Sequence, residues 1–287
     1  MRLRSVLLYA LLPAGCLVFA ELSVPGGVVR RLTGTASDDP GVQVVAERSD
    51  GLVRLYVTTT NCLDLTITLS AQPKNMRASP ALPVTLDTHG RSRVELVTLE
   101  PVDPAQPWSY PYTYHWYYGG RGGQPDGTVY QLPFEAGVRH RLFQGYRGSF
   151  SHQTGTPDEY AHDWDLAGDS LVLATRGGLV VGVRQDSNAG GVGDRFRRSA
   201  NYVIIRHDDG TYAEYLHLKQ NGALVKVGDQ VGAGQALGRS GNTGFTSRPH
   251  LHFAVFRTID GNTRESLPVQ FRTRDGRVQT LEAGKIY

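Results

Sequence analysis

Short runs of alternating apolar and polar residues recur along the chain, and they constrain its fold more than any other feature of the sequence. The run from Leu63 to Leu69 reads LDLTITL. Successive side chains of a β-strand point to opposite faces, so this run gives one apolar and one polar face. Similar runs occur at 42–45, 53–59 and 94–99, separated by turn-forming clusters. Helical periodicity is weak, and 34 Gly with 15 Pro are typical of a turn-rich chain. The pattern predicts an all-β protein whose N-terminal domain is β-sandwich-like.

The second half of the chain shows the same kind of pattern. Strand-like runs lie at 171–173, 179–183 and 202–205, beyond a glycine-rich turn at 119–127 that marks a boundary. A length of 287 residues suits two domains behind a targeting segment. We therefore expect a signal peptide at 1–20, an N-terminal β-sandwich domain and linker at 21–128, a second β-rich domain at 129–271 and a C-terminal extension at 272–287.

The first twenty residues, MRLRSVLLYALLPAGCLVFA, have the character of an export signal. A basic start is followed by an apolar run and by small residues up to Ala20. The run is shorter than the roughly 20 apolar residues of a membrane span, and no later run is as apolar. We expect cleavage before Glu21 and a product exported to the periplasm, the cell envelope or the medium, without a stable membrane span. A retained anchor and lipidation at Cys16 are the alternatives.

The charge and the cysteine content argue against nucleic-acid binding and against a disulfide. The formal charge is +3, and removing a segment that contains Arg2 and Arg4 lowers it by two. So small a charge does not predict nucleic-acid binding. Cleavage would also remove Cys16 and leave Cys62 alone, which excludes an intramolecular disulfide. We interpret Cys62 as a small core residue.

Aromatic residues alternate over 108–118, where the sequence reads WSYPYTYHWYY. The alternation places Tyr110, Tyr112, Tyr114 and Trp116 on one side of a strand. Such a face more often packs against a neighbouring sheet or domain than it binds a ligand. A sugar-stacking surface, as in an envelope carbohydrate-binding module, is the alternative.

Two of the nine histidines, His250 and His252, are separated by one residue in the apolar segment PHLHFAVF. A strand would project both imidazoles from one face. Such a pair is weak evidence of a metal site by itself, because two structural histidines look the same. Its context is more specific, since the glycine-rich segments GDQVGAGQALG at 228–238 and SGNTG at 240–244 precede it.

Together with YAHDW at 160–164, ATRGGLV at 174–180 and YLHL at 215–218, these segments resemble the LytM and lysostaphin type zinc peptidases, peptidase family M23. The resemblance covers roughly residues 143–258, in the family's order. It implies a β-rich peptidase domain with one Zn²⁺ per chain. Zinc catalysis on an amide needs three protein ligands and an open fourth position, which two histidines and one carboxylate provide.

The resemblance assigns His152, Asp163 and His252 as the zinc ligands and His217 and His250 as the catalytic pair. A free imidazole beside a metal can accept a proton and stabilise an oxyanion, whereas a ligated imidazole cannot move protons. We interpret the glycines of 228–244 as turn formers, because no helix follows them to make a phosphate site.

The first ligand is where the sequence departs from the family pattern. The family commonly separates this histidine from the aspartate by three residues, whereas residues 153–162 separate His152 from Asp163. The turn-like TGTPDE within this segment would let the chain fold back, which favours His152. His162 is the rival, but as the neighbour of Asp163 in an extended segment it should face the other side. His140 is more remote.

These features predict an exported zinc endopeptidase that hydrolyses cross-links or stem peptides of bacterial peptidoglycan. The N-terminal domain would serve as a spacer, a substrate positioner or a lid. A catalytically silent relative that regulates cell-wall amidases is the alternative, and zinc content would distinguish the two. We expect structural or supporting roles for Asn201 and His207, and solvated or turn positions for Asp165 and Asp169.

Overall fold

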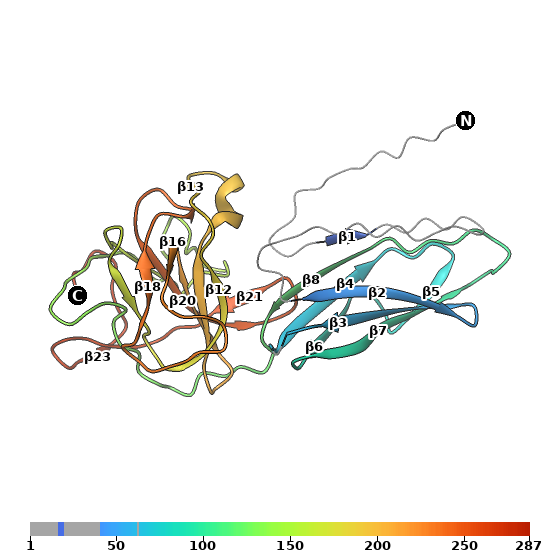
Figure 1. The fold of residues 1–287 in the computed structure, drawn as a ribbon, viewed down its shortest axis with the longest axis horizontal. Coiled ribbons are helices and arrows are strands. Elements are labelled where there is room, and N and C mark those ends of the chain that lie inside the picture. The colour runs from blue at the N-terminus through green and yellow to red at the C-terminus, as the bar shows by residue number, and fades with distance from the viewer. Residues whose placement is uncertain (1–16, 20–40, 62) are drawn as a thin grey trace.

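The computed structural model describes residues 17–19, 41–61 and 63–287. Cys62 and most of the expected signal peptide, including Cys16, lie outside these residues. Within the described part, no helix has the length and apolar character needed to cross a membrane. The architecture is almost entirely β, which confirms the predicted fold class. Two units lie side by side along the long axis of the molecule (Figure 1).

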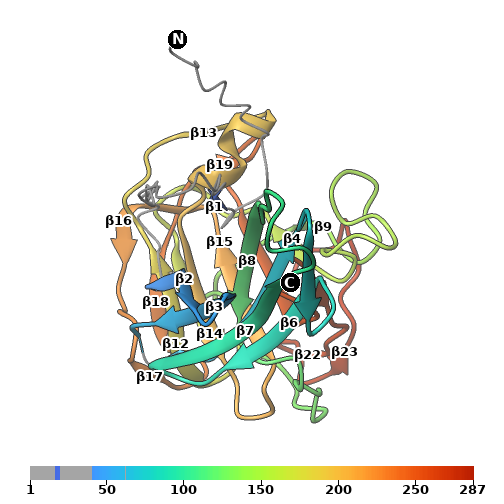
Figure 2. The same cartoon turned by 90° about the vertical axis from the view of Figure 1, so that its right-hand side faces the viewer.

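The N-terminal unit consists of two four-stranded antiparallel sheets. In hydrogen-bonded order, one sheet contains β2 (Val42–Ser49), β3 (Leu52–Thr59), β7 (Ser92–Pro101) and β5 (Met76–Ser79). The other contains β1 (Leu17–Phe19), β8 (Tyr112–Tyr118), β4 (Leu65–Ala71) and β6 (Val84–Thr88). Figure 2 looks at this unit end-on, with its strands in front of the second unit.

Alternating side chains fill the space between these two sheets. Val53, Leu55 and Val57 of β3 are buried, and their neighbours along the strand are only half-buried. Tyr112 and Tyr114 of the aromatic strand β8 are buried in the same core. The aromatic run therefore serves packing, as expected, because four of its tyrosines are almost fully buried and Trp116 is partly buried against the same core.

The second unit is built around an eight-stranded sheet. Its path runs β17 (Gln230–Val231), β12 (Gly178–Arg184), β14 (Tyr202–Arg206), β15 (Tyr212–Leu216), β20 (Leu251–Thr258), β10 (His162–Trp164) and β9 (Leu142–Gln144), and β21 (Arg264–Ser266) pairs with β20.

Smaller elements surround this sheet. One is a three-stranded sheet of β11 (Leu171–Leu173), β18 (Ala236–Ser240) and β16 (Leu218–Ala223). Two strand pairs join β13 (Gly190–Gly191) to β19 (Gly244–Phe245) and β22 (Phe271–Arg272) to β23 (Val278–Gln279). The 3-10 helix η1 spans Asp194–Ser199. Phe271 and Leu281 lie in the core of the second unit, so the last residues of the chain pack against it.

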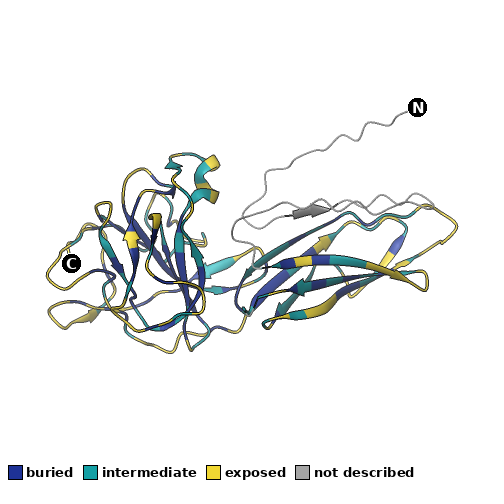
Figure 3. Cartoon of the chain, viewed as in Figure 1, coloured by how far each residue is buried: buried dark blue, intermediate teal, exposed yellow. Residues whose placement is uncertain are grey.

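The two faces of the large sheet have different neighbours. Leu251, Phe253 and Val255 of β20 enter the core of the second unit. Because strand residues alternate, His252 and Phe256 share the opposite face. Phe256 belongs to the core of the N-terminal unit, so the sandwich covers one end of the face that carries His252 at its other end. Figure 3 shows buried strands running through both units up to this junction.

Polar contacts and one glycine fix the junction between the units. Arg206 Nη1 lies 2.9 Å from Asp64 Oδ2, and the Gly261 amide donates to Thr68 Oγ1 at 2.9 Å. Gly119 has a φ of +87°, and a Cβ atom there would lie 2.3 Å from the ring of Tyr212. Only glycine fits this turn, because any side chain would collide with Tyr212 in a backbone conformation that other residues avoid.

Candidate metal centre

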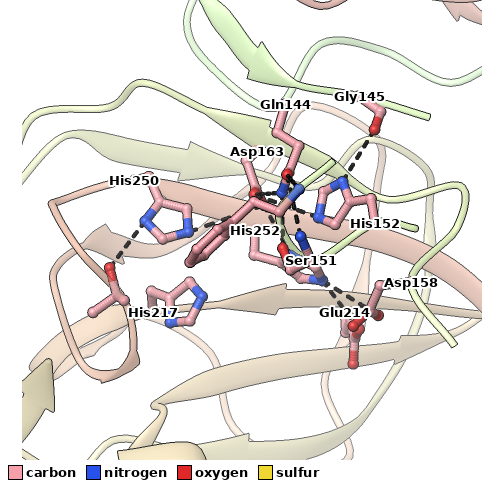
Figure 4. Close-up of polar contacts among 12 residues, drawn as sticks. Gln144, Gly145, Ser151, His152, Asp158, Asp163, Glu214, His217, His250 and His252 are labelled. Carbon is pink, nitrogen blue, oxygen red and sulfur yellow. Dashed lines mark hydrogen bonds and ion pairs between the residues drawn. The ribbon is translucent and has the colours of Figure 1, made fainter. Parts of the chain in front are cut away.

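The side chains of His152, Asp163 and His252 converge on one point on a face of the large sheet (Figure 4). His252 Nδ1 lies 2.9 Å from Asp163 Oδ1, and His152 Nε2 lies 3.4 Å from Asp163 Oδ2. Asp163 and His252 are directly paired in the antiparallel ladder of β10 and β20, so their side chains share a face. All three residues are buried.

Gln144 of β9 holds the loop that carries His152. Its Nε2 donates to Asp163 Oδ2 at 2.7 Å, and its Oε1 accepts the amides of Phe150 and Ser151 at 3.2 and 3.3 Å. One buried side chain thus orients the carboxylate of Asp163 and positions the backbone next to His152. No sequence motif points to Gln144, whose only signal is its place as a polar residue after the short apolar run of Leu142 and Phe143.

The segment between His152 and Asp163 folds back through a turn, as the sequence suggested. The Thr156 amide donates to Gln153 O at 3.0 Å. Further along, Pro157 O accepts the amide of Ser266 at 3.0 Å, and the Tyr160 amide donates to Ser266 Oγ at 2.9 Å. Strand β21 therefore anchors this loop from outside the motif.

His162 points away from the converging side chains. Its ring packs against the rings of Tyr146, Phe271 and Phe253, at centroid distances of 4.9, 5.0 and 6.2 Å. Burial lowers its pKa to about 3, and neither ring nitrogen has a hydrogen-bond partner. His140 also lies elsewhere, with Nδ1 donating to Asp165 O at 3.0 Å.

The ionisation state of Asp163 suits a metal ligand. Burial opposes the charge of Asp163, but the adjacent imidazoles of His152 and His252 outweigh it and hold the Asp163 pKa well below its usual range. His152 Nδ1 donates to Gly145 O at 3.2 Å, which leaves Nε2 as a lone-pair donor.

That Nε2 atom is fully buried without a hydrogen-bond partner. A buried nitrogen of this kind is costly unless something satisfies it, and a metal ion would. Two imidazoles and one carboxylate form a donor set that divalent metals accept. The residues therefore fit a metal ion.

His217 and His250 lie beside this group with their rings 4.4 Å apart. His217 Nδ1 donates to Thr243 O at 2.7 Å, and His250 Nδ1 donates to Arg248 O at 2.8 Å. Since a carbonyl can only accept, each ring keeps its proton on Nδ1 and an unprotonated Nε2. His250 Nε2 lies 4.0 Å from Asp163 Oδ1.

Burial keeps this pair of imidazoles neutral. It lowers the pKa of His250, and it lowers that of His217 to about 3. Strand β20 begins at Leu251, one residue later than the histidine pattern suggested, and His250 instead pairs with Gly241 in an isolated bridge. This bridge ties His250 to the glycine-rich segment that also carries Thr243.

Three charged residues that the sequence analysis missed lie behind His252. Its Nε2 is 3.5 Å from Glu214 Oε1 and 3.8 Å from Asp158 Oδ1. Arg264 pairs with both of these carboxylates. Burial opposes a charge on His252, but hydrogen bonds with Asp163 and Glu214 raise its pKa to about 10. The available signal was a glutamate inside the apolar run YAEYL.

Aromatic and basic residues form a rim around the group. Phe150, two residues before His152, is 66% exposed and stacks on Phe245 at 6.2 Å. The guanidinium of Arg197 lies over the ring of Phe245 at 4.5 Å. On the other side, Arg248 lies over Phe143 at 4.1 Å.

The remaining polar residues support the backbone. Asn201 Nδ2 donates to Ser187 O at 2.8 Å and to Leu218 O at 3.2 Å. His207 Nδ1 donates to Gly177 O at 2.8 Å. Asp169 has a φ of +73°, and Lys219 pairs with it at 3.0 Å.

Comparison with known proteins gives one family. Residues 158–265 match the model of peptidase family M23. An uncharacterized metalloprotease of Buchnera aphidicola is 42% identical over 59 residues, which cover 21% of this chain and 15% of the relative. The peptidoglycan DD-endopeptidase ShyA of Vibrio cholerae is 40% identical over 84 residues, 29% of this chain and 17% of the relative.

The solved structures that this chain is similar to include the catalytic domain of the antimicrobial peptidase lysostaphin from Staphylococcus simulans. It is 26% identical with a TM-score of 0.32, over 45% of this chain and 87% of that chain. The present chain spans less than a fifth of the length of the two curated relatives named above.

Proposed function

We propose that this chain, whose residues 158–265 match the model of peptidase family M23, is a zinc-dependent endopeptidase that hydrolyses peptide bonds in the cross-links or stem peptides of bacterial peptidoglycan. The observation that carries the proposal is the convergence of His152, Asp163 and His252 beside the neutral pair His217 and His250. Peptidoglycan is the substrate class named for the relative ShyA.

In this proposal His152 Nε2, an oxygen of Asp163 and His252 Nδ1 hold the metal. Zinc suits two imidazoles and one carboxylate, and when bound it would polarise the scissile carbonyl and activate a water molecule. Gln144 keeps Asp163 in place through the hydrogen bond to Oδ2.

His250 and His217 serve as proton acceptors and donors in the proposed mechanism. Each presents an unprotonated Nε2, because its Nδ1 proton is bonded to a carbonyl oxygen. An Nε2 atom that takes a proton from the attacking water can then donate it to the leaving amine. The imidazolium formed in between stabilises negative charge on the carbonyl oxygen, and low surrounding polarity strengthens that attraction.

We further propose that the N-terminal β-sandwich, residues 21–128, positions the substrate for the peptidase domain at 129–271, and that 272–287 completes the latter as a C-terminal extension. The sandwich packs on the sheet face that also bears His252, so it borders the approach to the site. The exposed Phe150, stacked on the half-buried Phe245, offers apolar contact to a peptide.

The proposed substrate lies outside the cytoplasmic membrane, so this function requires export. The basic and apolar start of the sequence supports a signal peptide at 1–20. A peptidoglycan peptide is then the proposed partner, in the periplasm or the cell envelope.

The test is digestion of purified peptidoglycan by the zinc-loaded protein, with the new termini identified by mass spectrometry. We expect new amino and carboxyl termini within the peptide part, which chelator treatment and His252→Ala abolish. Zinc binding without cleavage, combined with stimulation of an added cell-wall amidase, would instead support the regulatory alternative. The complete set of five residues argues against that alternative.

A further inference from the structure

A buried charge cluster lies behind the metal ligand His252, on the side away from Asp163. It consists of Glu214 in β15, Arg264 in β21 and Asp158 in the loop that precedes Asp163. The side chains of Glu214 and Arg264 are only 6% and 8% exposed. Burying these charged groups costs desolvation free energy, which only well-oriented ion pairs offset.

The orientation of His252 connects this cluster to the metal group. Its Nδ1 faces Asp163 Oδ1 at 2.9 Å, whereas its Nε2 faces Glu214 Oε1 at 3.5 Å. A neutral imidazole carries one proton, so a ring that offers Nδ1 to a metal must carry the proton on Nε2. Figure 4 shows the carboxylates of Glu214 and Asp158 on that side, and the oxygen of Glu214 is the nearer, at 3.5 Å against 3.8 Å.

We propose that Glu214, held by Arg264, is a positioning residue for His252: it accepts the Nε2 proton and thereby reserves the Nδ1 lone pair for the metal. The inference rests on the metal centre of the proposed function. A carboxylate that accepts the second ring proton of a ligating histidine fixes its tautomer and ring orientation, and it raises the basicity of the ligand.

Arg264 determines where Glu214 can lie. Its Nη2 pairs with Glu214 Oε1 and, at 2.6 Å, with Asp158 Oδ1, and its Nη1 donates to Pro157 O at 3.0 Å. The same guanidinium therefore holds the carboxylate behind His252 and the loop that brings His152 to the group.

The N-terminal sandwich closes the cluster from the other side. The guanidinium of Arg264 lies over the ring of Phe256 at 5.0 Å, and Tyr117 of β8 meets the same ring edge-on at 5.8 Å. Tyr117 and Phe256 thus shield the ion pairs from water, which strengthens them. The position of Glu214 consequently depends on packing between the two units as well as on Arg264.

The test compares zinc affinity in the full chain carrying Glu214→Gln or Glu214→Leu, measured by competition between the protein and a chromophoric chelator for Zn²⁺. The leucine variant removes the acceptor, and we expect its dissociation constant to rise about 10- to 100-fold. The glutamine variant keeps a neutral acceptor, and we expect an intermediate loss, because hydrogen bonds to charged groups are roughly twice as strong.

Glu265→Leu is the matched control. Glu265 follows Arg264 in β21, is more exposed than Glu214, and pairs with Arg257 rather than with the cluster. We expect its zinc affinity to equal that of the wild type. Thermal unfolding of each metal-free variant separates folding from binding, and if the leucine variant does not fold, the glutamine variant decides the question by itself.

Glu214 variants that bind Zn²⁺ as tightly as the wild type would overturn the proposal, even if their metal-free stability falls, because that result describes a purely structural ion pair. A wild-type chain that binds no zinc overturns the metal centre of the proposed function as well. A wild-type chain that binds zinc but leaves peptidoglycan intact overturns only the substrate, and the comparison of affinities still stands.

Discussion

Replacing His162 with phenylalanine removes a buried imidazole from a box of aromatic rings, and we expect it to make the protein less sensitive to acid. Burial lowers the pKa of His162 to about 3 in the folded chain, against about 6.5 in an unfolded one. The folded state therefore binds fewer protons than the unfolded state between these two values. The stability that the neutral ring contributes is complete above pH 6.5 and is lost as the pH falls towards 3.

The size of the effect follows from the two pKa values. Between pH 7 and pH 5, protonation of the unfolded chain at this one histidine lowers the free energy of unfolding by about 2 kcal/mol. His162→Phe abolishes that part of the pH dependence and leaves the other buried histidines unchanged. Between pH 7 and pH 5, the free energy of unfolding of the variant should therefore fall by about 2 kcal/mol less than that of the wild type.

Urea unfolding of the chelator-treated proteins at pH 7 and pH 5 measures this difference. Phe271→Leu is the control, because Phe271 contacts the His162 ring but does not titrate. This variant should lower the free energy of unfolding by the same amount at pH 7 and at pH 5. Equal pH dependence in His162→Phe and the wild type would refute the reasoning. Loss of zinc from His162→Phe, with zinc kept by His152→Ala, would show instead that His162 is the first ligand.

Other expected outcomes concern catalysis, support of the site and export. His217→Ala and His250→Ala should each keep about one zinc per chain and lower turnover by roughly two to four orders of magnitude, measured as zinc content beside hydrolysis rate. Gln144→Ala should weaken zinc binding about 10-fold in chelator competition, because Asp163 loses its hydrogen bond; an unchanged affinity would remove Gln144 from the site. N-terminal sequencing of the exported protein should give Glu21 as its first residue, and an intact Met1 or a lipidated Cys16 would contradict the signal peptide.

Much of the fold could be predicted because strand periodicity is a local property. Alternation in β3 predicted which side chains are buried. In β4 it predicted the burial of Leu65, Ile67 and Leu69, but Thr66 on the expected polar face is buried as well, because its hydroxyl donates to Gly119 O. The aromatic run predicted a packing strand. The same logic placed Asp163 and His162 on opposite faces of a short strand, and the structure has them so. The choice of His152 needed more than periodicity, because it depends on how a ten-residue segment folds back.

The resemblance to a family supplied the roles of the histidines, and only the structure supplied their surroundings. Gln144 reaches Asp163 because β9 pairs with β10, which neither segment encodes by itself. Likewise, the ring proton of His217 is placed by the carbonyl group of Thr243, in a distant glycine-rich segment. Such hydrogen bonds depend on long-range register, and no residue pattern in one sequence specifies register.

The sequence by itself determined an all-β chain with a set of histidines and an aspartate suited to zinc, because both follow from residue types and from a repeat of two along each strand. The tertiary structure alone decided that Glu214 and Arg264, fifty positions apart, meet behind His252. It also decided that the N-terminal sandwich packs on the face that bears the metal group. Both facts depend on the pairing of β15, β20 and β21 and on buried charges that must find partners, and these are fixed only when the whole sheet assembles.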